Sequence, residues 1–330
     1  MYRCKLWPYW VFVFKDLDLM KSILTICLNP ALQKTLVFAD YIPDTVNRAI
    51  LQRLDAAGKG INVSRVLTQL GKNSMHLTQL GGSFRPIFLE QCVQDGLKIE
   101  WVESRSSIRF CYTIINKKDK SVTELVEEGE EVEAKTGDRL LEAYKKLLPD
   151  VSTVVISGSK AAGFSDSFIS EMVCLAKARS LRVILDIRGK DLLECLPWKP
   201  DIIKPNLVEF ASTFAPGLVA GSKIKTINSA EDLASIKIKI MEICGDLYNK
   251  YQSQIILSQG SNAIWYMENG MFAEFEVDPV EPVNTIGSGD AFTAGLASAL
   301  DEGRALREAV AEGARCGRLN ALLLRPGVIR

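Results

Sequence analysis

The sequence predicts an α/β protein in which helices cover both faces of a mostly parallel β-sheet. Short, uniformly apolar runs alternate along the chain with amphipathic helical patterns, and strands of that kind are typical of a sheet buried on both faces. The 330 residues also contain no repeat, low-complexity tract or linker that would divide them into independent domains. We therefore expect one α/β unit.

The elements follow one another in a regular order from residue 22. We expect buried strands, each an apolar or β-branched run, at 23–28, 151–156, 183–187, 202–203 and 255–257. We expect amphipathic helices among them at 61–70, 165–176 and 291–300. Gly71 can end the first of these helices, and Ser165 can cap the second.

Two segments interrupt this rhythm. In residues 108–126, apolar side chains alternate with others around a charged turn at 117–120, which predicts a half-exposed hairpin. Residues 34–54 are also extended and are interrupted by Pro43. We expect these segments, at about 34–54 and 106–127, to form a small antiparallel lid over one edge of the main sheet.

Composition excludes several classes of protein. Lys plus Arg equals Asp plus Glu at 40 each, which does not favour a nucleic-acid partner. No segment from residue 20 onwards approaches the roughly 18 uncharged apolar residues of a membrane span. The single histidine, His76, argues against zinc sites and Ser-His-Asp triads.

The eight cysteines show no C-x-x-C pair, which is typical of a reducing compartment, so we expect a cytoplasmic protein. Residues 1–19 hold a cluster of aromatic residues around Pro8 but lack the small-residue cleavage site of a signal peptide. We expect them to be an N-terminal extension outside the fold, with the domain at 20–330.

The most informative motif is Gly287-Ser288-Gly289-Asp290, directly before a helical pattern. Its two glycines permit a tight turn, and a helix N-terminus with free N–H groups favours an anion such as a phosphoryl group. Asp290 could be an ordinary first-turn acid that complements the helix dipole. An aspartate beside an anion site is also what phosphoryl transfer to an alcohol requires as a proton acceptor.

Two further motifs stand at helix starts. Gly58-Lys59-Gly60-Ile61-Asn62 combines flexible backbone, a cation and an amide, and its alternative interpretation is a simple helix-capping loop. Asn206 and Glu209 follow a strand and lie three residues apart, so both could face one way and support Mg²⁺ through water. The alternative for this pair is a solvated helix start.

Together these motifs resemble those of the PfkB (ribokinase-like) carbohydrate kinases, most closely the 1-phosphofructokinase and tagatose-6-phosphate kinase branch. The similarity runs from about residue 20 to the end of the chain. In the family's order it includes Leu28-Asn29-Pro30-Ala31, the block at 58–62, Leu80-Gly81-Gly82, Ile156-Ser157-Gly158-Ser159, Leu185-Asp186, Lys204-Pro205-Asn206 with Glu209, Ser258 with Gly260, and the block at 287–290.

The resemblance implies a Rossmann-like, doubly wound domain with a small β-sheet lid. It implies that Asp290 is the catalytic base and that the backbone of Gly287, Ser288 and Gly289 holds the γ-phosphate of ATP. Asn206 and Glu209 are implied to support Mg²⁺. The residues implied on the nucleotide side are Lys204, Asn206, Ser258, Gly260, Gly287, Gly289 and Asn320. Those implied on the side of the sugar and its phosphate are Gln33, Gly58, Lys59, Gly60, Asn62, Arg109 and Ser159.

We therefore expect an ATP- and Mg²⁺-dependent kinase that acts on a sugar phosphate. Lys59 and Arg109 favour an acceptor that already carries phosphate, because guanidinium binds phosphate in a bidentate fork. Fructose 1-phosphate is the first candidate, followed by tagatose 6-phosphate or the acceptor of another PfkB kinase. Gln33 stands where the branch usually has an aspartate that holds sugar hydroxyls, which leaves open a non-catalytic sugar-phosphate sensor. The resemblance also implies a homodimer through the lid.

Overall fold

The computed structural model describes residues 21–220, 223–224 and 230–330. Segment 1–19 lies outside the described residues, so our expectation for it stays a prediction. Within them the main sheet has nine strands in the order β15-β14-β13-β10-β9-β8-β1-β4-β5. Their bounds are β1 (Ser22–Cys27), β4 (Ser74–Gly81), β5 (Ile99–Ser104), β8 (Val151–Ser157), β9 (Arg182–Asp186), β10 (Ile202–Ile203), β13 (Gln254–Gln259), β14 (Asn262–Glu268) and β15 (Met271–Phe275).

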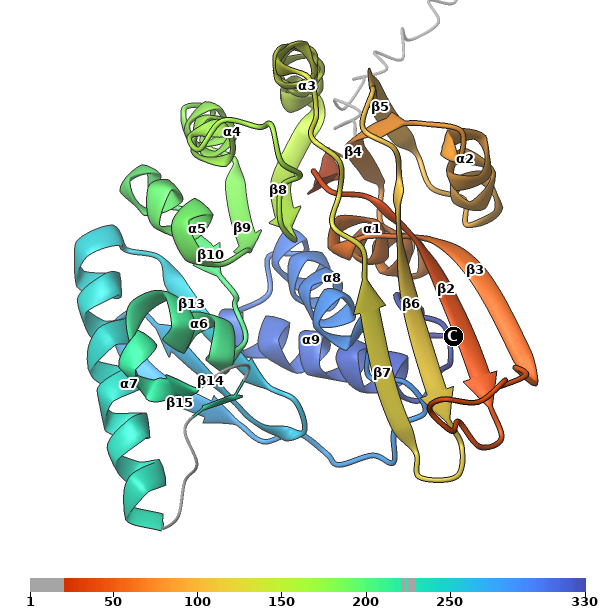
Figure 1. Cartoon of the computed structure of the whole chain (residues 1–330). Helices are drawn as coiled ribbons and strands as arrows, with labels where there is room; N and C mark the ends of the chain where they lie inside the picture. Colours follow the sequence, from red (N-terminus) through yellow and green to blue (C-terminus); the bar gives the residue numbers. More distant parts are fainter. Residues whose placement is uncertain (1–20, 221–222, 225–229) are drawn as a thin grey trace, which may run out of the picture.

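Neighbouring strands from β13 through to β5 run parallel, whereas β14 is antiparallel to both β13 and β15. Figure 1 shows β8 and β9 pointing the same way, toward the region where α8 begins. The mostly parallel sheet predicted from the apolar runs is confirmed. A separate short pair, β11 (Val219–Ala220) and β12 (Lys223–Ile224), follows the sixth helix.

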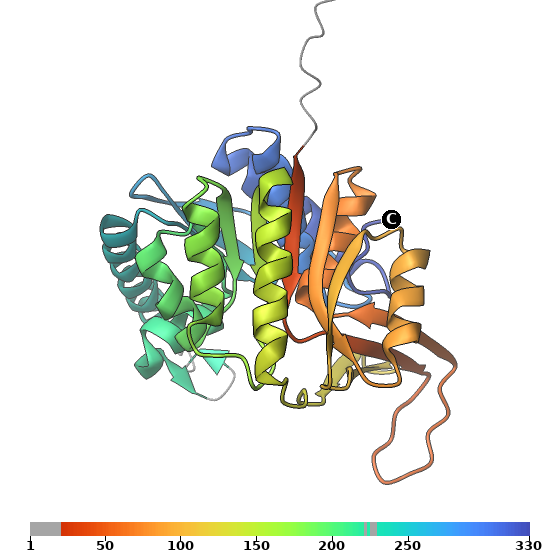
Figure 2. The same ribbon diagram turned by 90° about the horizontal axis from the view of Figure 1, so that it is seen from above.

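Helices cover both faces of this sheet. Their bounds are α1 (Lys59–Gln69), α2 (Arg85–Gln94), α3 (Ala134–Leu147), α4 (Phe168–Lys177), α5 (Gly189–Cys195), α6 (Leu207–Phe214), α7 (Ala230–Tyr251), α8 (Ser288–Asp301) and α9 (Leu306–Ala321). Successive strand residues point to opposite faces, so Leu24 packs in the cluster that contains α3 and α4, and Ile23 packs with α1 and α8. Figure 2 shows these two helical layers on either side of the strands.

A second sheet forms the lid, in the order β3-β2-β6-β7. Its strands are β2 (Ala31–Phe38), β3 (Leu51–Ala57), β6 (Arg109–Asn116) and β7 (Ser121–Val126). We expected an antiparallel lid, but β2 and β6 pair in parallel. The chain enters β2 from β1 and β6 from β5, and these core strands both run in one direction, so the two lid strands begin at the same end.

Some local expectations need correction. The segment expected to be extended at 34–54 contains a loop at 39–50, where Pro43 lies. Helix α4 begins at Phe168, and Ser165 does not cap it through its side chain but accepts a backbone hydrogen bond from Phe168. Gly71 does follow the end of α1 as predicted, with a φ of +76° that glycine adopts without strain.

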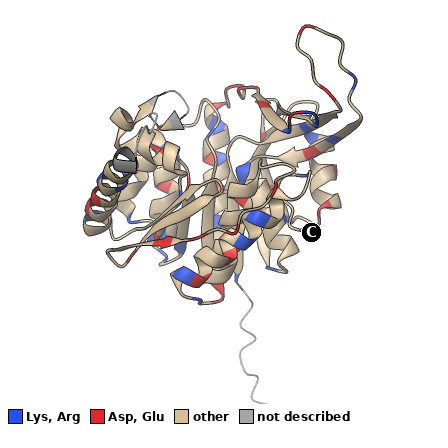
Figure 3. Cartoon of the chain, turned by 90° about the horizontal axis from the view of Figure 1, so that it is seen from below, with Lys and Arg blue, Asp and Glu red and all other residues tan. Residues whose placement is uncertain are grey.

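The structure shows how the charged residues and the cysteines are distributed. Figure 3 shows basic and acidic residues interspersed over the ribbon. Seven cysteines of the described chain are free thiols, and six of them are buried. None of the described helices has the length and the apolar character needed to cross a membrane.

Candidate active site

The start of α8 presents a glycine turn and a buried carboxylate. Gly287 precedes the helix with a φ of +82°, and a side chain there would approach the backbone nitrogen of Gly327 to 2.8 Å. The first N–H groups of a helix have no partner within the helix, and the backbone at Gly289 is exposed. Asp290 is only 6% exposed. The N–H of Ser288 donates to the carbonyl of Thr285, and the following amides of the helix start lie next to a buried acid, an arrangement that favours an anionic group.

Asp290 receives a hydrogen bond from the neighbouring helix start. The Nδ2 of Asn62, in α1, donates to Oδ2 of Asp290 over 2.8 Å. Burial raises the pKa of Asp290 to about 7, against the opposing effect of Lys59 and the Asn62 hydrogen bond. A carboxylate with this pKa is poised to accept a proton near neutral pH.

The start of α1 lies directly against the end of β1. A side chain at Gly60 would approach the carbonyl oxygen of Ile26 to 2.5 Å, and one at Gly58 would approach Sγ of Cys27 to 2.6 Å. Only glycine permits this close packing at both positions. The two glycines bring Lys59 and Asn62 to the carboxyl edge of the sheet, where Asp290 also lies.

Lys59 lies between two carboxylates. Its Nζ is 3.7 Å from Oδ1 of Asp186 and 3.4 Å from Oε1 of Glu209. Asp186, and Glu209 beside it, raise the pKa of Lys59 well above its ordinary value, so the ammonium stays charged. The structure thus brings together Lys59 and Glu209, which the sequence assigned to opposite sides of the site.

Asp186, at the end of β9, is a residue that sequence reasoning left without a role. It also lies 3.6 Å from Nζ of Lys204 and accepts hydrogen bonds from Ser157 and Thr293. Although burial opposes ionisation, the two lysines and these hydrogen bonds hold its pKa below the ordinary value. The sequence did contain a signal for Asp186, since it is an acidic residue at the end of an apolar strand that lies close in the chain to predicted site residues.

Asn206 and Glu209 face each other across the start of α6. The backbone N–H of Glu209 donates to Oδ1 of Asn206, and that of Asn206 donates to Oε2 of Glu209, which together form a capping box. The donor set is oxygen, which suits Mg²⁺. The described residues contain no group of three or more His, Cys, Asp or Glu that could hold a metal, so a fit to Mg²⁺ requires water and phosphate oxygens to complete the shell.

A cavity of about 720 Å³ opens beside this helix start. Its lining includes four residues predicted on the nucleotide and metal side: Asn206, Glu209, Ser258 and Gly260. Asn206 and Ser258 are also joined by an isolated parallel bridge. The sequence did not single out Arg188 or Trp265, which line the same cavity. A cavity of this size accommodates a nucleotide.

The remaining predicted acceptor residues gather around the base of the lid. Arg109, the first residue of β6, donates from Nη1 to the carbonyl of Glu127 and from Nη2 to that of Asn29. Its Nε is buried without a hydrogen-bond partner in the described part of the chain. Nδ2 of Asn29 in turn lies 3.5 Å from the hydroxyl of Ser159. Gln33 is buried on the face of the lid that also carries Arg109, and its Nε2 donates to the hydroxyl of Thr113 over 2.5 Å.

The model of the family described as pfkB family carbohydrate kinase matches residues 33–324. The chain belongs to this family.

The pfkB kinase has relatives along most of its length. A tagatose-6-phosphate kinase from Staphylococcus epidermidis is 29% identical over 309 residues, which is 93% of this chain and 94% of the relative. The structure of phosphofructokinase-2 from Escherichia coli in complex with fructose-6-phosphate superimposes with a TM-score of 0.78 at 18% identity, covering 93% of this chain and 96% of the other. A possible 1-phosphofructokinase from Thermotoga maritima gives a TM-score of 0.76 at 24% identity, covering 90% of both chains. These likenesses confirm the ribokinase-like fold.

Asn320 of this pfkB kinase is enclosed behind the glycine turn. Its Nδ2 donates to the carbonyl of Ile286 and to the hydroxyl of Ser288, and its Oδ1 accepts from the backbone of Gly327 and Val328. It is fully buried. With its carboxamide engaged in this way, Asn320 orders the turn from behind and does not face the 720 Å³ cavity.

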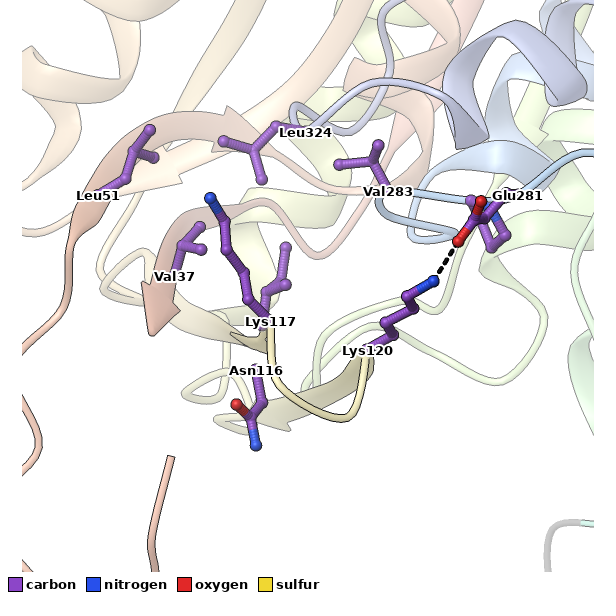
Figure 4. Close-up of a pocket in the computed structure, with 10 residues that line it drawn as sticks. Val37, Leu51, Asn116, Lys117, Lys120, Glu281, Val283 and Leu324 are labelled. Atoms are coloured by element: carbon purple, nitrogen blue, oxygen red, sulfur yellow. Dashed lines mark hydrogen bonds and ion pairs between the residues drawn. The ribbon is translucent and has the colours of Figure 1, made fainter. Parts of the chain in front are cut away.

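A second cavity, of about 480 Å³, lies at the far end of the lid of the pfkB kinase (Figure 4). It is bounded by lid residues such as Val37 and by Val283 and Leu324 of the core. Lys120 of the lid turn and Glu281 both line this cavity and form an ion pair. The predicted site residues do not line this cavity, so it is separate from the site at the base of the lid.

Proposed function

We propose that this pfkB kinase transfers the γ-phosphoryl group of ATP to a hydroxyl of a sugar phosphate. Fructose 1-phosphate, giving fructose 1,6-bisphosphate, is the first candidate acceptor, and tagatose 6-phosphate is the second. The observation that carries the proposal is Asp290. It is a buried carboxylate at an amide-rich helix start, hydrogen-bonded to Asn62, with a pKa raised to about 7 by burial. Asp290 accepts the proton of the acceptor hydroxyl. The hydroxyl oxygen forms a bond to the γ-phosphorus, and the bond from that phosphorus to the oxygen it shares with the β-phosphate breaks, which releases ADP.

The amides at the start of α8 hold the transferred phosphoryl group, because the free N–H groups and the helix dipole favour negative charge there. Ser258, Gly260 and Lys204 serve the nucleotide side. Asn206 and Glu209 would hold Mg²⁺ through water, and the metal would supply positive charge that offsets the charge on the phosphate oxygens. Lys59 stays protonated between Asp186 and Glu209 and remains a cation throughout turnover.

The acceptor phosphate binds at the base of the lid. Arg109 supports this assignment because its Nε is buried without a partner in the part of the chain that the structure describes. A buried unpaired donor is costly, and a phosphate oxygen would satisfy it. Ser159 lies across from Arg109, with Asn29 between them.

Arg109→Ala is expected to raise KM for the sugar phosphate by roughly 10–100-fold, because it removes a charge-assisted contact. KM for ATP should change little. The measurement is a coupled ADP-release assay over fructose 1-phosphate, tagatose 6-phosphate and their unphosphorylated sugars, with Arg105→Ala on the preceding loop as the control. If the variant weakens ATP alone, Arg109 faces the nucleotide. If the wild-type protein releases no ADP with any acceptor but binds sugar phosphates, it is a sensor.

Gln33→Asp is expected to change the ranking of acceptors by kcat/KM while leaving KM for ATP unchanged. A carboxylate accepts two hydroxyl protons with charge assistance, whereas the amide offers one carbonyl and an N–H₂ donor. Gln33→Asn is the matched control, since it shortens the side chain equally without adding charge. Gln33 pairs with Asp55 on β3, so the charged variant should also unfold at a lower temperature. An unchanged ranking would mean that position 33 does not touch the sugar.

We also propose that two copies pair through the outer face of the lid. This face carries half-buried Phe110 and Tyr112, and Leu125 is 52% exposed. Apolar patches of this kind mark interaction surfaces. Sedimentation at micromolar concentration should give a dimer, and Leu125→Asp should shift it to a monomer. A wild-type monomer at that concentration refutes the pairing.

The free cysteines support a cytoplasmic location.

A further inference from the structure

A buried chain of hydrogen bonds connects α2 to the carboxylate of Asp290. Nε of Arg65 donates to Oδ2 of Asp95, the residue that follows α2, over 2.7 Å. Nη1 of Arg65 donates to Oδ1 of Asn62 over 2.8 Å, and Nδ2 of Asn62 donates to Asp290 over the same distance. Arg65 is 2% exposed and Asn62 is 6% exposed. Water therefore has little access to substitute for any of these contacts.

The chemistry of Arg65 determines which way the Asn62 carboxamide points. A guanidinium has only donors, so the atom of Asn62 that faces it must be the carbonyl oxygen. The N–H₂ group must then face Asp290. In the flipped orientation, two N–H groups would oppose each other at Arg65 and two oxygens would oppose each other at Asp290. Both contacts would be repulsive in a buried site.

Arg65 is itself held firmly. Its other Nη1 contact is to the carbonyl of Pro326 at 3.2 Å, and Nη2 donates to the carbonyl of Ala56. Gly327 closes over the pair, since a side chain there would come within 2.9 Å of Nη1 of Arg65. The guanidinium is therefore fixed by groups from β3, α2 and the C-terminal segment, and it cannot turn away from Asn62 without losing several buried hydrogen bonds.

We propose that Arg65 is a positioning residue for phosphoryl transfer, because it fixes the Asn62 carboxamide in the one orientation that donates to Asp290. This inference rests on the proposed role of Asp290 as the base. With Oδ2 of the carboxylate held by Asn62, Oδ1 is directed to the acceptor hydroxyl. Arg65 touches neither substrate and acts only through Asn62.

Arg325 provides a matched control within the same ionic cluster. Its Nη2 lies 2.7 Å from Asp95, the same carboxylate that Arg65 binds, and its Nε lies 2.7 Å from Asp55. The contacts of Arg325 are to these acids and not to Asn62. Loss of either arginine disturbs the cluster, but only loss of Arg65 releases the carboxamide.

The experiment measures kcat across pH for Arg65→Lys, Arg65→Met and Arg325→Met. Arg65→Met is expected to lose roughly 10–100-fold in kcat, with KM for both substrates within about threefold of wild type. Its acid limb should move to higher pH, because the Asn62 hydrogen bond lowers the pKa of Asp290. Arg65→Lys should recover part of both, because an ammonium also has only donors to offer Asn62. Arg325→Met should keep both the kcat and the acid limb of the wild-type pH profile. Equal losses in Arg65→Met and Arg325→Met, with an unmoved limb, would reduce Arg65 to a structural residue.

Two further measurements separate the possible failures. In an Asn62→Ala background, Arg65→Met should cost no further activity, whereas an additive loss contradicts action through Asn62. If no Arg65 variant folds, a neutron structure of the wild-type protein decides, because deuterium must lie on the Asn62 atom facing Asp290. An active Asp290→Asn protein would sink the proposed base. An inactive one together with fully active Arg65 variants would sink only the positioning role.

Discussion

Asp290→Asn is expected to lower kcat by roughly 10²–10⁴-fold while the protein keeps its fold and its affinity for ATP. Asparagine is nearly isosteric with aspartate and can still pair with Asn62, but it cannot accept the acceptor's proton. The variant therefore removes the base with little change in packing. Steady-state kinetics with fructose 1-phosphate or the best acceptor of the panel measures the loss.

A matched substitution at the other end of the same helix serves as the control. Asp301 ends α8 and accepts a hydrogen bond from Ser152, so Asp301→Asn changes a carboxylate of the helix without touching the site. It should keep turnover within about threefold of wild type. Circular dichroism and ATP titration confirm the fold of both variants. Near-normal turnover of a folded Asp290→Asn protein would show that another group takes the proton.

The pH dependence gives an independent check on Asp290. Because burial raises its pKa to about 7, kcat/KM of the wild-type protein should fall tenfold per pH unit below that value. The same shift affects stability. The folded protein holds this proton more tightly than the unfolded chain, so the carboxyl favours folding at acid pH and loses that contribution as pH rises from about 4 to 7. Asp290→Asn should therefore melt above wild type at pH 8 and equal it near pH 4.

Lys59→Met is the second substitution with a large expected effect. It is expected to raise KM for the sugar phosphate by roughly 10–100-fold, because methionine fills similar space but removes the charge-assisted contact. The ammonium also lowers the pKa of Asp290, so its loss should move the acid limb of kcat/KM to higher pH. These two effects are separable, because the first depends on acceptor concentration and the second does not.

Lys160→Met is the control for Lys59→Met. Lys160 also forms an ion pair, with Asp191, and its loss should leave KM for the sugar phosphate and the acid limb of kcat/KM near wild type. The position of Lys59 beside Asp186 and Glu209 allows a specific contrary outcome. If Lys59→Met raises KM for ATP and leaves KM for the sugar phosphate unchanged, Lys59 serves the nucleotide. Asp186→Asn should then give the same pattern, because it removes the acid that anchors Lys59.

The sequence predicted those features of the fold that depend on nearby residues. Apolar runs such as 151–156 and the helix start at Gly58-Lys59-Gly60 have a local cause, namely burial on both faces or the need for glycine at a close contact. The family resemblance, and not the spacing, implied that Asp290 is the base and that Asn62 faces the sugar. Their hydrogen bond joins residues 228 positions apart.

Features that depend on which elements pack together escaped the sequence. The parallel pairing of β2 with β6 follows from the direction of two core strands, which no pattern within the lid reports. The reciprocal capping of Asn206 and Glu209 was open to two interpretations, because spacing fixes proximity and not hydrogen-bond direction. Asp186 acquires its partners only when α1, β9 and α8 meet. Arg65 acquires its long-range partners only when α1 meets β3, the end of α2 and the C-terminal segment. Burial and charge pairing identified them once the fold was known.

The lid has a consequence for how this kinase can acquire new substrates. Its strands alternate, so Gln33, Cys111 and Thr113 share the inner face while their neighbours point outward. The proposed transfer groups instead belong to the core helices and to buried charge pairs. Directed evolution could therefore randomise these inner lid positions and alter which sugar is accepted, with the phosphoryl chemistry inherited intact. Natural divergence within such a scaffold would follow the same route, with specificity changing in the lid sheet while the transfer groups on the core helices stay the same.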